Sequence, residues 1–216
     1  MNKILMTGNP NENIAAGMKS LFQDDINFVS RANGYNLIND TDIQKLVDLS
    51  KNYEIFINSS LLKNFAQTTI LQRVWTEWKA SNKSGTIINF GSSADYFHRA
   101  DNKLYAVEKR ALRDLCKNLS LHCTWHDSKI KVVYFAFGGV DTPKTKEQWP
   151  HFTVHSVQEI CETVKWILDA PETMNIDELH ITPIQPLPKQ ELKKLNTNIK
   201  QPNFDSGDNR TFLIDD

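Results

Sequence analysis

The chain of 216 residues lacks the features that mark several special classes of protein. Its three cysteines (Cys116, Cys123 and Cys161) are odd in number and have no C-x-x-C spacing, so we expect reduced thiols, no disulfide framework and no metal site. No apolar run is long enough to span a bilayer and the first residues form no signal-peptide core, which favours a cytoplasmic protein without a membrane partner. A net charge of −1 gives no electrostatic reason to expect binding to nucleic acid.

The residues that are present suit a single α/β domain. Short apolar stretches alternate along the chain with segments of helical spacing, and this alternation predicts a Rossmann-like, doubly wound parallel sheet with helices on both faces, in three layers. We expect this domain to cover residues 1–185 and a polar C-terminal tail to cover 186–216. The expected strands are 3–7, 26–29, 34–38, 53–57, 85–90, 129–137 and 176–184, and the expected helices are 14–22, 43–49, 65–80, 103–119 and 156–168.

Residues with chemical or conformational character follow most of the predicted strands directly. Gly8, Arg31, Asn58, Ser92 and Gly138 each come after one of them. Parallel sheets bind ligands at the carboxyl ends of their strands, near the point where the strand order reverses. The sequence therefore predicts a ligand site at this edge of the sheet.

The strand 85–90 is followed by Ser92 and Ser93, and then by a helix that carries Tyr105 and Lys109. Residues four apart lie on one helix face, about 6 Å apart along the axis, so the lysine charge favours ionisation of the phenol. A tyrosine with a pKa of about 10 needs such help to exchange protons at neutral pH, and a serine hydroxyl nearby can fix a substrate oxygen. This pattern predicts a site for carbonyl reduction. The alternative is a surface helix with a solvated lysine and a half-buried tyrosine.

The serine, the Tyr-x-x-x-Lys spacing and the small Ala106 beside the tyrosine resemble the active-site segment of the short-chain dehydrogenases/reductases. The resemblance implies catalytic roles for Ser92, with Ser93 as the second choice, and for Tyr105 and Lys109. The family's fourth active-site residue, an asparagine, best matches Asn64; the alternative for this residue is an exposed loop or a helix cap. The implied reaction is hydride transfer between a nicotinamide cofactor and a small-molecule carbonyl or alcohol, with the tyrosine as general acid/base.

The resemblance extends from Lys3 to about Ile184 and implies a cofactor site. An arginine after the second strand suits the 2′-phosphate of NADP(H), which we therefore favour over NAD(H). The cofactor-binding residues that the resemblance implies are Thr7, Gly8, Asn13, Ile14, Ser30, Arg31, Asn58, Ser59, Tyr105, Lys109 and Thr142.

The loop from Thr7 to Ala15 departs from the family's glycine-rich pattern. Only Gly8 is kept, Asn13 and Ala15 stand at the later glycine positions, and Glu12 would repel an anion if it pointed inward. These departures support an alternative from another class, a degenerate protein of this fold that binds a dinucleotide or regulates without catalysis. An epimerase or dehydratase of the extended branch would need a larger C-terminal substrate domain. The helices through which members of the family often pair match residues 65–80 and 103–119, which is consistent with a homodimer or homotetramer and leaves the oligomeric state open. Trp75, Trp78 and Leu115 fit such a surface or a buried core equally well.

Overall fold

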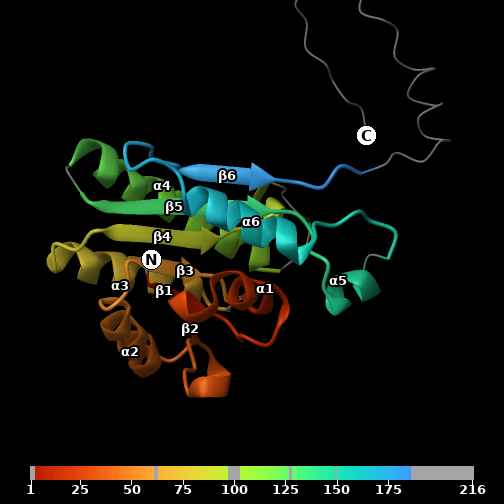
Figure 1. Ribbon diagram of the computed structural model, residues 1–216, viewed down its shortest axis with the longest axis horizontal. Coiled ribbons are helices and arrows are strands. Elements are labelled where there is room, and N and C mark those ends of the chain that lie inside the picture. Colours follow the sequence, from red (N-terminus) through yellow and green to blue (C-terminus); the bar gives the residue numbers. More distant parts are fainter. Residues whose placement is uncertain (1–2, 61–62, 97–102, 127, 149, 186–216) are drawn as a thin grey trace, which may run out of the picture. The chain divides into compact units, whose positions relative to one another are not determined.

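The computed structural model describes residues 3–60, 63–96, 103–126, 128–148 and 150–185 (Figure 1). Its strands form one parallel sheet in the order β2-β1-β3-β4-β5-β6. The elements, with η for 3-10 helices, are β1 (Ile4–Thr7), α1 (Asn13–Phe22), η1 (Gln23–Asp25), β2 (Ile26–Val29), η2 (Arg31–Asn33), α2 (Asp40–Ser50), β3 (Ile55–Asn58), α3 (Ala66–Ala80), β4 (Gly85–Phe90), η3 (Ser93–Tyr96), α4 (Tyr105–Trp125), β5 (Ile130–Phe137), α5 (Pro143–Gln148), α6 (Val157–Leu168) and β6 (Glu178–Ile181).

The sheet is covered by helices on both faces, because its strands bury side chains in both directions. Along β1, Leu5 packs into a cluster with residues of α2, α3 and α4, whereas Ile4 and Met6 pack into a second cluster with residues of α1 and α6. Phe56 of β3 joins the first cluster and Ile57 the second. Both strands are apolar except for their last residues, Thr7 and Asn58, as expected for a parallel sheet buried on both faces. The predicted Rossmann-like, three-layer fold is confirmed.

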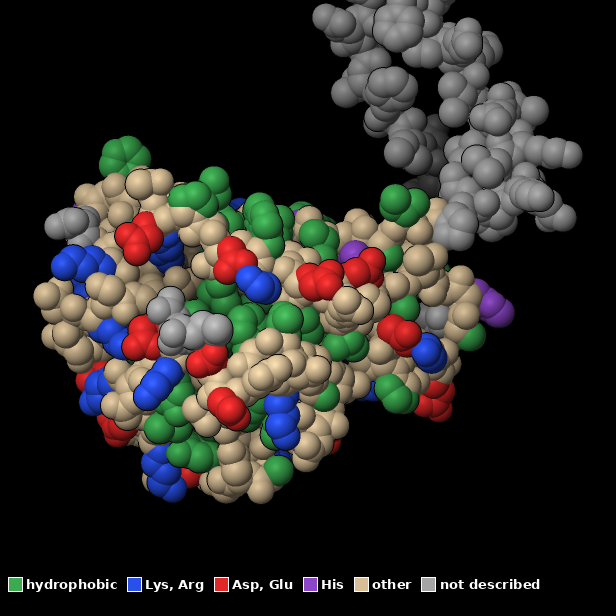
Figure 2. All heavy atoms as spheres, viewed as in Figure 1, with side chains coloured by type: hydrophobic (Ala, Val, Ile, Leu, Met, Phe, Trp, Pro, Cys, Tyr) green, Lys and Arg blue, Asp and Glu red, His purple; other side chains and the backbone are tan. Residues whose placement is uncertain are grey.

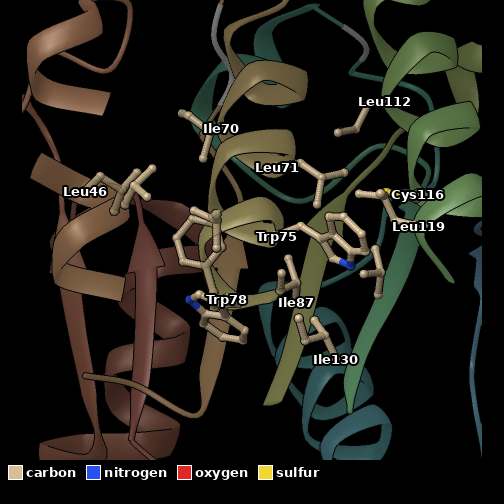
Figure 3. Packing of buried hydrophobic residues seen from close by; sticks show 14 of the residues in the cluster. Leu46, Ile70, Leu71, Trp75, Trp78, Ile87, Leu112, Cys116, Leu119 and Ile130 are labelled. Carbon is tan, nitrogen blue, oxygen red and sulfur yellow. The ribbon is translucent and has the colours of Figure 1, made fainter. Parts of the chain in front are cut away.

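Helix α3 lies at the centre of the larger cluster. Figure 3 shows its side chains Trp75 and Trp78 beside Ile87 and Ile130 of the sheet, with Leu46 of α2 on one side. The Trp78 side chain is fully buried, and its indole N–H donates to Ser50 Oγ at 3.0 Å. Trp75 and Trp78 therefore belong to the core, the second of the two alternatives left open by the sequence.

The start of α6 illustrates how well local sequence signals fix some elements. Ser156 accepts a hydrogen bond from the Glu159 N–H at 3.1 Å, and the Glu159 carboxylate accepts one from the Ser156 N–H at 2.6 Å. This reciprocal pair is a capping box, which satisfies two N–H groups that the first helical turn leaves without partners.

The prediction of a strand at 34–38 is wrong. After β2 the chain forms the 3-10 helix η2 and then turns, with Gly34 in the left-handed region at φ 91°. The Asn36 N–H donates to the Asp42 carboxylate at 3.0 Å instead of to a neighbouring strand. The apolar residues Tyr35 and Leu37 in this segment line a cleft, described below.

The compact unit that contains the sheet comprises Met1–Pro183. Within the described ranges, no helix is both long and apolar enough to cross a membrane. The same part of the chain holds no group of three or more His, Cys, Asp or Glu residues placed to bind a metal ion. On the face shown in Figure 2, acidic and basic side chains are interspersed, in keeping with the net charge of −1.

Candidate active site

A cleft of about 440 Å³ opens beyond the carboxyl ends of β1, β2 and β3. Because β2 lies on one side of β1 and β3 on the other, the strand order reverses here, which is where parallel α/β sheets bind ligands. Of the predicted cofactor-binding residues, Gly8, Asn13, Ile14, Ser30, Arg31 and Ser59 line the cleft. Its remaining lining residues are Met6, Asn9, Glu12, Ala15, Tyr35, Leu37, Ser60 and Phe90.

The turn between β1 and α1 forms one wall of the cleft. Gly8 has φ 148°, a conformation that residues with a side chain rarely adopt, and its N–H donates to the Val29 carbonyl at 2.9 Å. A Cβ at this position would lie 3.4 Å from both Ala15 Cβ and Ser59 Oγ, so the turn packs closely against α1 and the end of β3. Asn13, the first residue of α1, takes φ 46°, which asparagine tolerates better than most residues.

Glu12 also lines the cleft, directly before α1. Its carboxylate accepts a hydrogen bond from Asn9 Nδ2 at 2.6 Å, and no side chain caps the start of the helix. The N–H groups at a helix start attract anions, whereas a carboxylate at the same place repels them. The end of the cleft beside α1 therefore combines one group that attracts anions with one that repels them.

Thr7 and Asn58 hold the strand ends together, and both side chains are fully buried. Thr7 Oγ1 accepts hydrogen bonds from the N–H groups of Ser59 and Ser60 at 2.9 and 3.0 Å. Asn58 Nδ2 donates to the Gln67 carbonyl and to Asn89 Oδ1 at 2.9 and 3.0 Å. Their contribution to a cofactor site is thus to position Ser59 and the ends of β1 and β3.

The loop after β2 presents Ser30 and Arg31 to the cleft, and Asn33 fixes its shape. Asn33 Oδ1 accepts from the Ser30 N–H at 2.7 Å, while Asn33 Nδ2 donates to the Phe28 carbonyl at 2.6 Å. The Arg31 guanidinium is exposed at this end of the cleft, where it can pair with a phosphate group.

Ser92 lies just beyond β4, at the same edge of the sheet. Its hydroxyl oxygen accepts a hydrogen bond from the Ala94 N–H at 3.2 Å. A hydroxyl has one proton to donate, and accepting from Ala94 leaves that proton available for the oxygen of a ligand. Ser93, the second choice, is the first residue of η3.

Tyr105 and Lys109 lie one helical turn apart at the start of α4, and the lysine is buried. Tyr105 is 39% exposed and Lys109 only 5%, with Lys109 Nζ 5.9 Å from the centre of the Tyr105 ring. Lys109 Nζ donates to Gln67 Oε1 at 2.8 Å and to the Phe90 carbonyl at 2.7 Å. Because Phe90 also lines the cleft, these contacts join the start of α4 to the cleft. The alternative of a solvated lysine is wrong.

Burial lowers the pKa of Lys109 from 10.5 to about 8, and nearby Cys116, Glu108 and Asp95 oppose that shift. The ammonium group still predominates at neutral pH, held by two neutral acceptors. Lys109 thus places a positive charge 5.9 Å from the centre of the Tyr105 ring, and its role in ionising that phenol stays a prediction.

Asn64 and Thr142, two further predicted site residues, lie in local turns. Asn64 is exposed in the turn before α3, with φ 59°. Thr142 Oγ1 lies 2.8 Å from Thr145 Oγ1 and accepts from the Thr145 N–H at 3.2 Å, so it caps the start of α5. The roles of both residues in catalysis or cofactor binding stay predictions.

The sequence analysis missed Gln67, Asn89 and Asn33. Gln67 Nε2 donates to the Asn58 and Phe90 carbonyls at 2.7 and 3.1 Å, while Gln67 Oε1 accepts a hydrogen bond from Lys109 Nζ. A signal existed for two of them, since Gln67 falls on the apolar face of α3 and Asn89 interrupts the apolar strand β4. Polar residues in such places are buried and must find hydrogen-bond partners.

Comparisons with known proteins agree with the fold. No protein-family profile and no curated protein matches the sequence. Among solved structures, a short-chain dehydrogenase/reductase family protein has a TM-score of 0.65 at 15% identity, covering 83% of this chain and 95% of its own. The closed form of a serine dehydrogenase complexed with NADP+ has a TM-score of 0.63 at 16% identity, covering 85% and 94%.

A third similar structure is a 4-hydroxyisoleucine dehydrogenase mutant complexed with NADH and succinate. It has a TM-score of 0.65 at 17% identity, with 84% of this chain and 96% of that chain covered. The chain thus has the fold of the short-chain dehydrogenases/reductases, and the predicted resemblance is confirmed at the level of the fold.

Proposed function

We propose that this protein is an NADP(H)-dependent oxidoreductase of the short-chain dehydrogenase type, which reduces a carbonyl group or oxidises an alcohol on a small organic substrate. The observation that carries the proposal is the burial of Lys109. This lysine lies one helical turn from Tyr105, and its Nζ donates a hydrogen bond to the carbonyl of Phe90, which lines the cleft. Burying a charge between neutral acceptors is unfavourable for stability, and groups of this kind concentrate at functional sites.

Two features of the cleft suit a dinucleotide: the turn that contains Gly8, and the polar groups at the ends of the cleft. Gly8 and Ser59 would lie against the pyrophosphate, and Ser30 with Arg31 would bind the 2′-phosphate of the adenosine ribose. Thr142 is proposed to contact the carboxamide. When bound, the reduced nicotinamide supplies the hydride for the carbonyl carbon. NAD(H) is the alternative cofactor, and it would leave Arg31 without a phosphate partner.

The chain's own residues would handle the substrate oxygen and its proton. Ser92 donates its hydroxyl proton in a hydrogen bond to the carbonyl oxygen. Tyr105 gives its phenolic proton to the same oxygen as negative charge develops there, and Lys109 stabilises the resulting phenolate. In the direction of alcohol oxidation, Tyr105 takes up the proton instead.

A second candidate is a protein of this fold that binds a dinucleotide, or regulates, without catalysis. Glu12 at the cleft favours a noncatalytic protein of this fold, because a carboxylate there weakens the attraction of the α1 N-terminus for the cofactor phosphate that turnover requires. This candidate predicts no turnover, with weak or no dinucleotide binding, whereas the oxidoreductase predicts both binding and turnover.

The experiment compares the wild-type protein with Tyr105→Phe in NADPH oxidation with a panel of small aldehydes, ketones and 3-oxo esters. We expect the variant to lose about a hundredfold or more in kcat while its Kd for NADPH stays within about twofold. Tyr53→Phe, which removes a hydroxyl beside β3 at the opposite end of the sheet, is the matched control. Unchanged turnover in Tyr105→Phe would contradict the proposed mechanism, and a wild-type protein without any turnover would favour the second candidate.

A further inference from the structure

A buried tyrosine and a buried aspartate lie directly behind the segments that carry the proposed catalytic residues. The Tyr134 side chain, from the middle of β5, is fully buried, and its hydroxyl donates to Asp95 Oδ2 at 2.7 Å. The Asp95 side chain, from η3, is also fully buried. Burial and the nearby Asp95 carboxylate raise the pKa of Tyr134, so the phenol keeps the proton that it donates.

The Tyr134 hydroxyl touches both segments of the proposed site. The Ser92 N–H donates to its oxygen at 3.4 Å, and the carbonyl of Lys109, in the second turn of α4, lies 3.3 Å from it. The Asp95 N–H in turn donates to the Ser92 carbonyl at 3.2 Å, which closes the loop after β4. A Cβ on Gly91 would lie 2.3 Å from the Tyr134 ring, so the ring packs against bare backbone.

This arrangement is more than a way of filling the core. A phenylalanine in β5 would fill the same space without a polar atom, and a residue other than aspartate in η3 would avoid burying a carboxylate. Of the charged groups described around it, Arg113 Nε is 4.0 Å from Asp95 Oδ2. A buried carboxylate and a buried phenol thus lie where the Ser92 loop meets α4.

We propose that Tyr134 and Asp95 are positioning residues, which hold the Ser92 loop and the first turns of α4 in the relative placement that the reaction needs. The inference rests on the proposed function, since Ser92, Tyr105 and Lys109 are the residues being placed. Neither Tyr134 nor Asp95 lines the cleft that contains Gly8, Ser30 and Arg31, so we expect their main effect on the chemical step, where Ser92 and Tyr105 are proposed to act.

The test is a set of variants assayed with NADPH and the carbonyl compound that wild type reduces fastest. Tyr134→Phe should lower kcat about tenfold or more while the Kd for NADPH changes less than about twofold. In a Ser92→Ala background, Tyr134→Phe should cause a clearly smaller further loss than in wild type, because part of its effect passes through Ser92 and the rest through α4. Asp95→Asn, which keeps an acceptor for the Tyr134 hydroxyl, should stay near wild type, whereas Asp95→Ala should resemble Tyr134→Phe.

A purely structural role predicts a different pattern. Tyr134→Phe would then lower the melting temperature with kcat unchanged, or its loss in kcat would multiply with that of Ser92→Ala; either result overturns the proposal. Tyr53→Phe controls for the loss of a hydroxyl elsewhere.

Amide hydrogen exchange of the segment 91–96 gives a readout that needs no turnover. We expect exchange in this segment to rise at least about tenfold in Tyr134→Phe relative to Tyr53→Phe. Unchanged exchange overturns the positioning inference whether or not wild type is active. If exchange rises in Tyr134→Phe but the wild-type protein shows no turnover, the proposed function has failed. The catalytic role of Tyr134 and Asp95 as positioning residues then fails with it.

Discussion

Replacing Lys109 by methionine tests the electrostatics of the candidate site without a substrate. Lys109 is 5% exposed, its ammonium group has two neutral acceptors, and burial lowers its pKa from 10.5 to about 8. One pKa unit corresponds to about 1.4 kcal/mol, so burying the charged form costs about 3 kcal/mol of stability at neutral pH. Methionine keeps the length of the apolar stem and removes the charge.

The sign of the pH dependence follows from the two pKa values. Between pH 8 and 10.5 the unfolded chain keeps the Lys109 proton while the folded chain loses it. The free energy of unfolding therefore rises with pH across this window through Lys109, and the penalty is fully present below pH 8. The Lys109→Met variant lacks this rise, so its stability relative to wild type should fall by about 2.5 kcal/mol between pH 7 and pH 10.

Urea unfolding of both proteins at the two pH values gives that difference directly. Other groups that titrate in this range, such as the buried Cys116 thiol with its raised pKa, are present in both proteins and largely cancel. The exposed Lys19→Met variant should follow wild type at both pH values. Curves for Lys109→Met and wild type that stay parallel within about 0.5 kcal/mol would refute the burial of this charge.

Three further predictions concern the cleft. Arg31→Ala should raise the Kd for NADPH about tenfold and leave that for NADH within about twofold, measured by nicotinamide fluorescence; equal losses would show that Arg31 meets no 2′-phosphate. Glu12→Gln should tighten NADPH binding about threefold to tenfold at low salt and less at high salt, and an unchanged affinity would mean that the carboxylate points away. Asn33→Ala should lower the free energy of unfolding by about 1–2 kcal/mol in urea titrations and weaken NADPH binding, whereas an unchanged affinity would separate this loop from the cofactor.

Most of the fold could be predicted because its signals are local. Continuous apolar strands, helical spacing and the capping box at Ser156 each need only a few neighbouring residues. A strand is wrongly predicted for 34–38 because Tyr35 and Leu37 alternate with polar residues, as apolar residues do in a strand. In the folded chain these two apolar side chains line the cleft instead, and Gly34 with its positive φ turns the chain away from the sheet.

The candidate site could be predicted in outline but not in its supporting contacts. The helical spacing brings Tyr105 and Lys109 onto one face, yet the burial of Lys109 depends on Gln67, which is 42 residues away in the sequence. The pairing of Asp95 with Tyr134, 39 residues apart, is equally invisible to local patterns. Such contacts arise only when the sheet brings distant strands side by side.

Dinucleotide binding is tested most directly by titrating the purified protein with NADPH and, separately, with NADH. We expect saturable binding of both, with NADPH at least about tenfold tighter because only its 2′-phosphate pairs with Arg31. Binding of neither nucleotide would contradict the proposed cofactor site, since it would mean that the turn from Gly8 to Asn13 does not hold a pyrophosphate.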